Sequence, residues 1–120
     1  MHFKKTLTAT FIFGITLVSA TLAQAHSALE SASPAEGSTV NNVPDELELN
    51  FTSPLFLTYV SLTPQDGDSI TLKVPGRQLK ADYVLPLPEL DTGHYTVEWR
   101  SMSNDGHGMR DTFSFNLTDK

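Results

Sequence analysis

Three residues of this chain have the types and positions to form a metal site: His26, Asp105 and His107. His26 follows the tripeptide Ala-Gln-Ala (23–25), the small-x-small pattern at which secretory signal peptides are cleaved. Cleavage there leaves a histidine that carries a free α-amine. Its Nα and Nδ1 atoms can then close a six-membered chelate ring on a metal ion, which an internal histidine cannot do because its backbone nitrogen is an amide.

The residues before His26 have the organisation of a secretory signal peptide. Lys4 and Lys5 form a positive start, and an apolar run covers residues 10–18. The alternative, an uncleaved membrane anchor, fits less well because a bilayer span needs about 20 apolar residues. We therefore expect residues 1–25 to be removed and residues 26–120 to form a single exported domain.

Asp105 and His107 lie in a glycine-containing segment, Ser-Asn-Asp-Gly-His-Gly (103–108). Residues two apart in an extended chain project to the same side. Taken alone, this pattern indicates an exposed histidine beside an Asp-Gly turn. Added to the chelating nitrogens of His26, it completes a set of three nitrogens and one oxygen, which suits one tetragonal Cu(II) ion per chain. Zinc is the competing metal, but its sites are usually tetrahedral.

The composition narrows the possible functions of residues 26–120. Removing Lys4 and Lys5 from the 8 Lys+Arg leaves 6 against 14 Asp+Glu, a formal charge of −8. Such a chain gains nothing from neutralising phosphates, so we expect neither nucleic-acid binding nor a basic patch for an anionic membrane. The absence of cysteine excludes disulfides, thiolate metal sites and thiol redox chemistry.

The elements that must position these residues are strands. Apolar and polar residues alternate with period two in several short runs, separated by Asp-Gly, Pro-Gly and proline-rich segments. About seven strands at this spacing predict an all-β, immunoglobulin-like Greek-key sandwich. The clearest expected strands cover residues 46–51, 59–63, 69–74, 79–85, 95–100 and 112–117.

Several stretches of the chain resemble the CopC family of small periplasmic copper-binding proteins of bacteria. They are HSALESASPAEGSTV from residue 26, PDELELNF from residue 44 and TGHYTVEWRSMSNDGHGMRDTFSF from residue 92. The resemblance implies an immunoglobulin-like sandwich in the periplasm. It also implies a Cu(II) site made by His26 through its amine and imidazole, Asp105 and His107. Members of the family act in copper homeostasis, in copper resistance or beside a membrane copper importer, which implies similar partners here.

The chain departs from the family in two ways. Residues 54–85 contain no methionine, so the Met-rich Cu(I) loop of some members is missing; Met102 and Met109 are expected to pack. The carboxylate that many members carry after the Leu-x-Phe strand is replaced by Thr52-Ser53.

Two other function classes remain open. The first is a copper mono-oxygenase with a histidine brace, although such enzymes are usually much longer than this domain. The second is a metal-free immunoglobulin-like interaction module. The favoured prediction is a monomeric, non-enzymatic copper-binding protein.

Overall fold

The computed structural model describes residues 28–119, which contain β-strands and no helix. In chain order the strands are β1 (Leu29–Ser33), β2 (Thr39–Val40), β3 (Glu46–Pro64), β4 (Ile70–Leu72), β5 (Leu79–Pro86), β6 (Gly93–Met102) and β7 (Gly108–Leu117). The described part of the chain contains no helix of the length and apolarity that a membrane crossing needs. The all-β prediction is confirmed.

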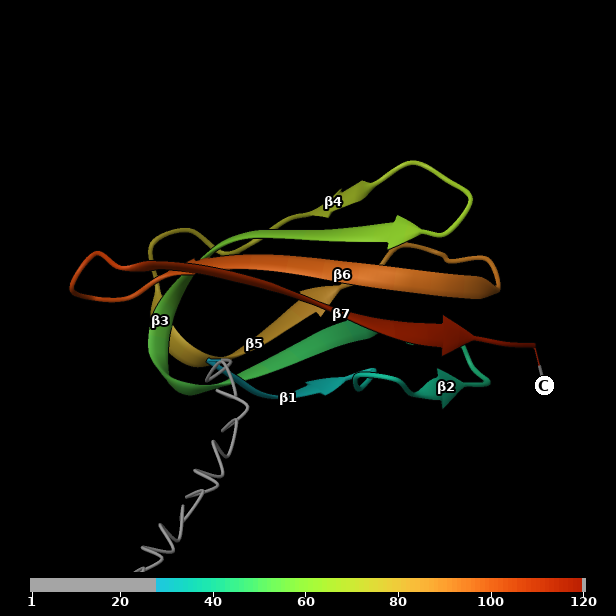
Figure 1. Ribbon diagram of the computed structural model, residues 1–120, viewed down its shortest axis with the longest axis horizontal. Coiled ribbons are helices and arrows are strands. Elements are labelled where there is room, and N and C mark those ends of the chain that lie inside the picture. Colours follow the sequence, from blue (N-terminus) through green and yellow to red (C-terminus); the bar gives the residue numbers. More distant parts are fainter. Residues whose placement is uncertain (1–27, 120) are drawn as a thin grey trace, which may run out of the picture.

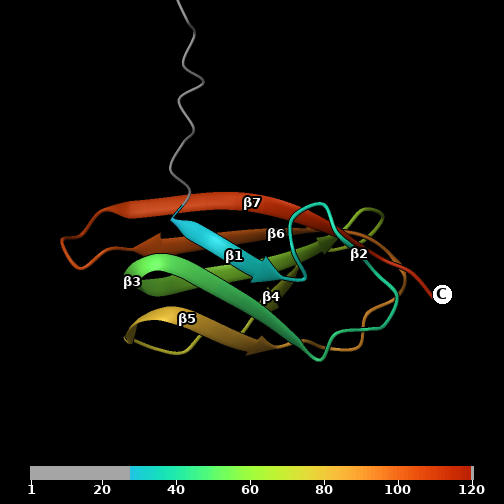
Figure 2. The ribbon, with the colours of Figure 1, turned by 90° about the horizontal axis from the view of Figure 1, so that it is seen from below.

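The strands form two layers that share β3 (Figures 1 and 2). The first half of β3 pairs with β1 and β5, and its second half pairs with β4 and β6. Strand β6 continues the second layer to β7, which pairs in parallel with the short β2. This arrangement is a β-sandwich, as the alternation of the sequence predicts.

The prediction of separate strands over 46–51 and 59–63 is wrong, because both belong to the single long β3. The strand bends at the exposed segment 52–54, and its register with β5 shifts between Asn50 and Leu55. Pro54 has no N–H to give to a ladder, which confines it to such an irregularity. The Tyr83 hydroxyl lies 2.6 Å from the Leu55 carbonyl oxygen and 2.7 Å from that of Gln78, and so fastens the bend to β5.

The core lies between the layers and consists of the inward-facing residues of each strand. Trp99 is buried and packs edge-to-face on Phe51, with ring centroids 5.1 Å apart. Tyr95 stacks on Phe115 at 5.5 Å. Burial of aromatic and aliphatic side chains from both layers provides the main stabilisation of a domain that has no disulfide.

Candidate metal centre

The β6–β7 hairpin carries two of the three predicted site residues at its tip. The strands pair from Gly93↔Leu117 to Met102↔Gly108, so β7 begins several residues before the predicted start near Thr112. The loop closes through a hydrogen bond from the Gly106 N–H to the Ser103 carbonyl oxygen at 3.0 Å. Gly106 has a φ of +91°, a conformation that favours glycine, and this explains the Asp-Gly pair in the sequence.

The structure brings Asp105 and His107 together. Asp105 Oδ2 lies 2.9 Å from His107 Nδ1, and the two side chains are 67% and 82% exposed. An Nδ1–H that donates to this carboxylate leaves the Nε2 lone pair available to a metal ion. The pair can therefore present one imidazole nitrogen and one carboxylate group to solvent.

Ser103 organises this pair and was not singled out in the sequence. Its hydroxyl donates to Asp105 Oδ1, and it accepts a hydrogen bond from the His107 N–H at 3.1 Å. The Ser103 hydrogen bond, followed by the contacts with His107, lowers the pKa of Asp105 from 3.8 to about 2. Asp105 thus remains an anion over the whole neutral and mildly acidic range. The only signal in the sequence is a hydroxyl two residues before an Asp-Gly pair, a common turn arrangement.

His26, the third predicted ligand, lies outside the described residues. Ala28 is the first described residue, and its carbonyl oxygen accepts a hydrogen bond from the Thr52 N–H at 2.8 Å. Strands β1 and β7 both run away from the end of the sandwich that carries the β6–β7 loop (Figure 2). Strand β1 therefore begins on the side of the sandwich that faces this loop.

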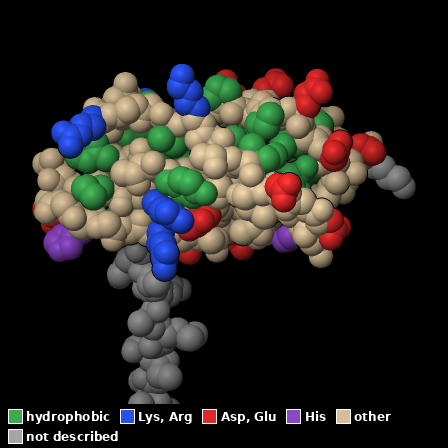
Figure 3. All heavy atoms as spheres, turned by 90° about the horizontal axis from the view of Figure 1, so that it is seen from above, with side chains coloured by type: hydrophobic (Ala, Val, Ile, Leu, Met, Phe, Trp, Pro, Cys, Tyr) green, Lys and Arg blue, Asp and Glu red, His purple; other side chains and the backbone are tan. Residues whose placement is uncertain are grey.

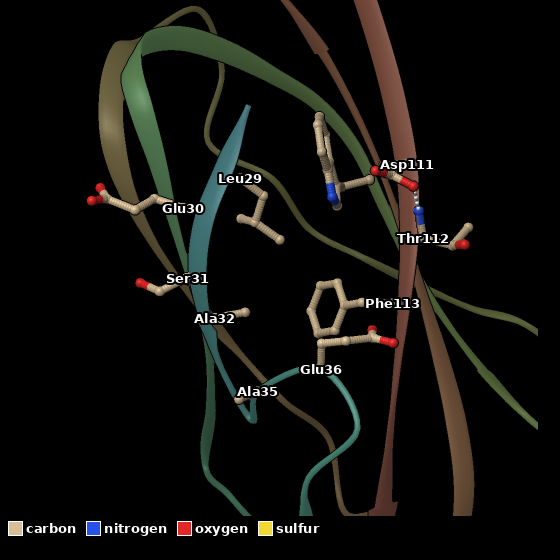
Figure 4. A pocket seen from close by; sticks show the side chains of 10 residues that line it. Leu29, Glu30, Ser31, Ala32, Ala35, Glu36, Asp111, Thr112 and Phe113 are labelled. Carbon is tan, nitrogen blue, oxygen red and sulfur yellow. Dashed lines mark hydrogen bonds between the residues drawn. The ribbon is translucent and has the colours of Figure 1, made fainter. Parts of the chain in front are cut away.

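The start of β1 faces β6 and β7 across a hollow of about 440 Å³. Trp99 of β6 lines this hollow. Leu29 and Phe113 point into it, and Asp111 lies on its β7 side (Figure 4). Leu29 and Asp111 are therefore at similar levels along the sandwich. No group of three or more metal-ligating side chains occurs within residues 28–119, so Asp105 and His107 stand there as a pair.

The two methionines of the domain lie on opposite faces of the hairpin. Met109 is the ladder partner of the buried Ser101 and shares its inward side, whereas Met102 alternates with Ser101 and faces outward. Their sulfur atoms are thus not arranged to bind one soft ion together.

His94 lies at the other end of β6. Its Nδ1 atom is 2.9 Å from Asn116 Oδ1, the side chain of its ladder partner. The side chain is partly buried, and this contact indicates a structural role for His94.

A small β-sandwich with an Asp-His pair at one end is the class of protein that the fold and this hairpin define. The CopC domain family matches residues 29–118. The chain therefore belongs to the CopC family.

Named relatives of the chain agree with this assignment. It is 30% identical over 125 residues to copper resistance protein C of Escherichia coli, covering 95% of each chain. It is 31% identical over 116 residues to the protein of the same name from Pseudomonas syringae pv. tomato, covering 88% of this chain and 91% of the relative.

Solved structures show the same fold. CopC from Methylosinus trichosporium OB3b is 26% identical, with a TM-score of 0.65 over 78% of this chain and 94% of that one. PcoC, a methionine-rich copper resistance protein from Escherichia coli, is 26% identical, with a TM-score of 0.56 over 75% and 96% of the two chains. The present chain contrasts with PcoC in having three methionines, one of them at position 1.

Proposed function

We propose that this protein is an exported, periplasmic Cu(II) carrier that acts in copper homeostasis or resistance and is not an enzyme. The observation that carries the proposal is the Asp105–His107 pair, presented at the end of the sandwich that the start of β1 faces. Membership of the CopC family and relatives named copper resistance proteins support copper as the ion. We further propose a monomer that exchanges copper with a membrane importer or another periplasmic protein.

The proposed site consists of His26, His107 and Asp105, with residues 1–25 removed as a signal peptide. His26 would contribute its α-amine and imidazole, His107 its Nε2 and Asp105 a carboxylate oxygen. Three nitrogens and one oxygen suit Cu(II), which also stands highest in the affinity order of divalent metals for such ligands. The Asp105 carboxylate would have a second task, since it orients the His107 ring.

Chain reach is compatible with this site. Three residues of extended chain, from Leu29 back to His26, span about 10 Å, and four residues from Asp111 back to His107 span about 14 Å. An extended stretch before Leu29 that ran toward the β6–β7 loop would bring the two histidines to the same end of the molecule, because each imidazole extends several ångströms beyond its backbone. The tether between Ala28 and Thr52 leaves only Ser27 between the described domain and His26.

The test compares protein processed to begin at His26 with protein that keeps one methionine before it. Intact mass establishes the first residue, and Cu(II) titration followed by EPR measures the site. We expect the extended form to keep its fold and lose most of its Cu(II) affinity, because its His26 nitrogen is an amide. Equal affinity in the two forms, or a mature chain that begins after His26, would refute the proposed site.

A Zn(II) titration of the same two proteins tests the choice of metal. We expect Zn(II) to bind more weakly than Cu(II) and to respond less to the extension. Tighter binding of Zn(II) than of Cu(II) would contradict a copper carrier. Oxidation of a polysaccharide by the copper-loaded protein with a reductant would contradict the non-enzymatic role.

A further inference from the structure

The outer face of the second layer carries an exposed apolar row beside the proposed copper site. Leu79, Phe56 and Met102 are ladder neighbours across β5, β3 and β6, so their side chains lie side by side. Leu79 is 44% exposed and Met102 is 45% exposed, while Phe56 is half-buried. These side chains lie on the outside of the sandwich and do not pack into its core, so they are available for contact with another molecule.

A second row on this face is aromatic and basic. Tyr59 is the ladder partner of Arg100, which is the partner of Arg110. The Arg100 guanidinium lies 4.4 Å from the centre of the Tyr59 ring and 3.2 Å from Glu98 Oε1. Arg110 makes no ion pair or side-chain hydrogen bond within the described residues.

Two arginines directly opposite each other on one face of a sheet repel and cost stability. Glu98 offsets the charge of Arg100, so Arg110 is the uncompensated positive charge of this row, in a chain whose overall charge after processing is −8. Arg77 adds to this charge, because it lines a hollow together with Phe56 and Met102. The pairing of β6 with β7 thus places arginines beside aromatic and apolar side chains on this face.

Charge is divided along the molecule. Figure 3 shows basic side chains among hydrophobic ones over one part of the surface, while acidic side chains gather toward the opposite end. At that opposite end Asp66, Glu89 and Asp91 line one hollow with Gly93, the start of β6. The basic part of this face therefore differs in sign from the end that carries Asp66, Glu89 and Asp91.

From these observations we propose that the six residues Phe56, Tyr59, Leu79, Arg100, Met102 and Arg110, here termed the platform, form a docking surface for an acidic protein partner. Tyr, Phe, Met and Arg are the residue types enriched at the centres of protein interfaces. Arginine also matches carboxylates in a bidentate geometry. Lipid headgroups are a poorer match, because polybasic membrane sites typically hold clusters of 4–8 Lys or Arg.

The platform lies next to the loop with Asp105 and His107, because Met102↔Gly108 is the last ladder pair before that loop. A partner seated on the platform would thus lie beside the proposed copper ligands. The role of the surface in copper exchange rests on the proposed function, whereas docking itself does not, and it can be measured on the metal-free protein.

The experiment uses metal-free protein and a soluble peptide of alternating glutamate and leucine as the probe, followed by NMR. We expect weak, salt-sensitive binding that shifts the signals of Tyr59, Arg100 and Met102. Arg110→Glu should weaken binding at least fivefold. The control N41E/N42E changes the net charge by the same two units, but on an exposed loop away from the platform, and should change binding less than twofold. Met102→Ser should weaken binding at least threefold, because the apolar row would lose one of its exposed side chains.

Three outcomes would overturn the proposal. One is peptide binding that is absent, or is weakened equally by Arg110→Glu and by the control. Another is binding to phosphatidylglycerol vesicles in preference to the peptide, which would make the occupant a membrane. The third is self-association in sedimentation experiments that Arg110→Glu abolishes, which would make it a second copy of the chain. Failure of Cu(II) binding would refute the proposed function and leave these measurements interpretable.

Discussion

The substitutions His107→Ala and His94→Ala should separate a copper ligand from a structural histidine. His107 lies on an exposed loop, so its loss should change the apo free energy of unfolding by less than about 0.5 kcal/mol. His94 is partly buried and hydrogen-bonded to Asn116, so its loss should cost about 1 kcal/mol. For a domain of this size, 1 kcal/mol lowers the melting temperature by about 4–8 °C.

In the presence of copper, His107→Ala should become the more damaging of the two substitutions. Cu(II) at a thousandfold excess over Kd stabilises the folded protein by about 4 kcal/mol. Loss of a ligating imidazole should weaken binding at least as much as loss of a supporting residue, which reaches about a hundredfold. At the same copper concentration a hundredfold weaker site stabilises by only about 1.4 kcal/mol. His107→Ala should therefore lose most of the copper-induced rise, and His94→Ala should keep it in full.

Thermal unfolding followed by circular dichroism measures the melting temperature of each variant without Cu(II) and its rise when Cu(II) is added. The reasoning is refuted if His107→Ala retains the full copper-induced rise, or if His94→Ala abolishes it. An apo melting temperature that falls more for His107→Ala than for His94→Ala would contradict the assignment of their structural roles.

Three further predictions follow from other contacts. Tyr83→Phe should lower the free energy of unfolding by about 1–3 kcal/mol, because the buried Leu55 carbonyl oxygen at the bend of β3 loses its donor; urea unfolding that shows a change below about 0.5 kcal/mol would contradict this role. Ser103→Ala should raise the pKa of Asp105 from about 2 toward 3.8, as followed by NMR titration. Because the depressed pKa stabilises the fold above pH 4 and this contribution is lost as the pH falls toward 2, the variant should depend less on pH in that window. Met102→Leu and Met109→Leu should leave Cu(I) binding weak and unchanged in competition with a Cu(I) chelator, since the two side chains face opposite ways; a tight Cu(I) site removed by either substitution would show otherwise.

The sequence predicts the fold where one side of a strand is buried and the other is not. Leu47, Leu49 and Phe51 alternate in this way, as do Tyr95, Val97 and Trp99, and all six are core residues. The continuity of β3 could not be predicted, because the exposed segment around Pro54 interrupts the alternation at the bend. The start of β7 was missed for a related reason, since its first residues are exposed on both sides.

For the candidate site too, the sequence predicts some features and only the structure reveals the others. Short-range spacing predicts that Asp105 and His107 share a side, and the structure brings them together. The role of Ser103 depends on the turn that Gly106 allows, which is a matter of backbone geometry rather than of residue pattern. The platform combines side chains from β3, β5, β6 and β7, so only the register of the ladders reveals it.

The shared strand β3 also determines the order in which the domain can be completed. Its first half needs β5, and its second half needs β6, which begins only at Gly93. Pairing between segments so far apart in the chain is intrinsically slow, because the intervening loop must close before the contacts form. The partly synthesised chain therefore has no stable sandwich to adopt until most of the domain is present. For a protein that we propose to be exported, this delay keeps the chain open during the interval in which it has to be threaded across a membrane.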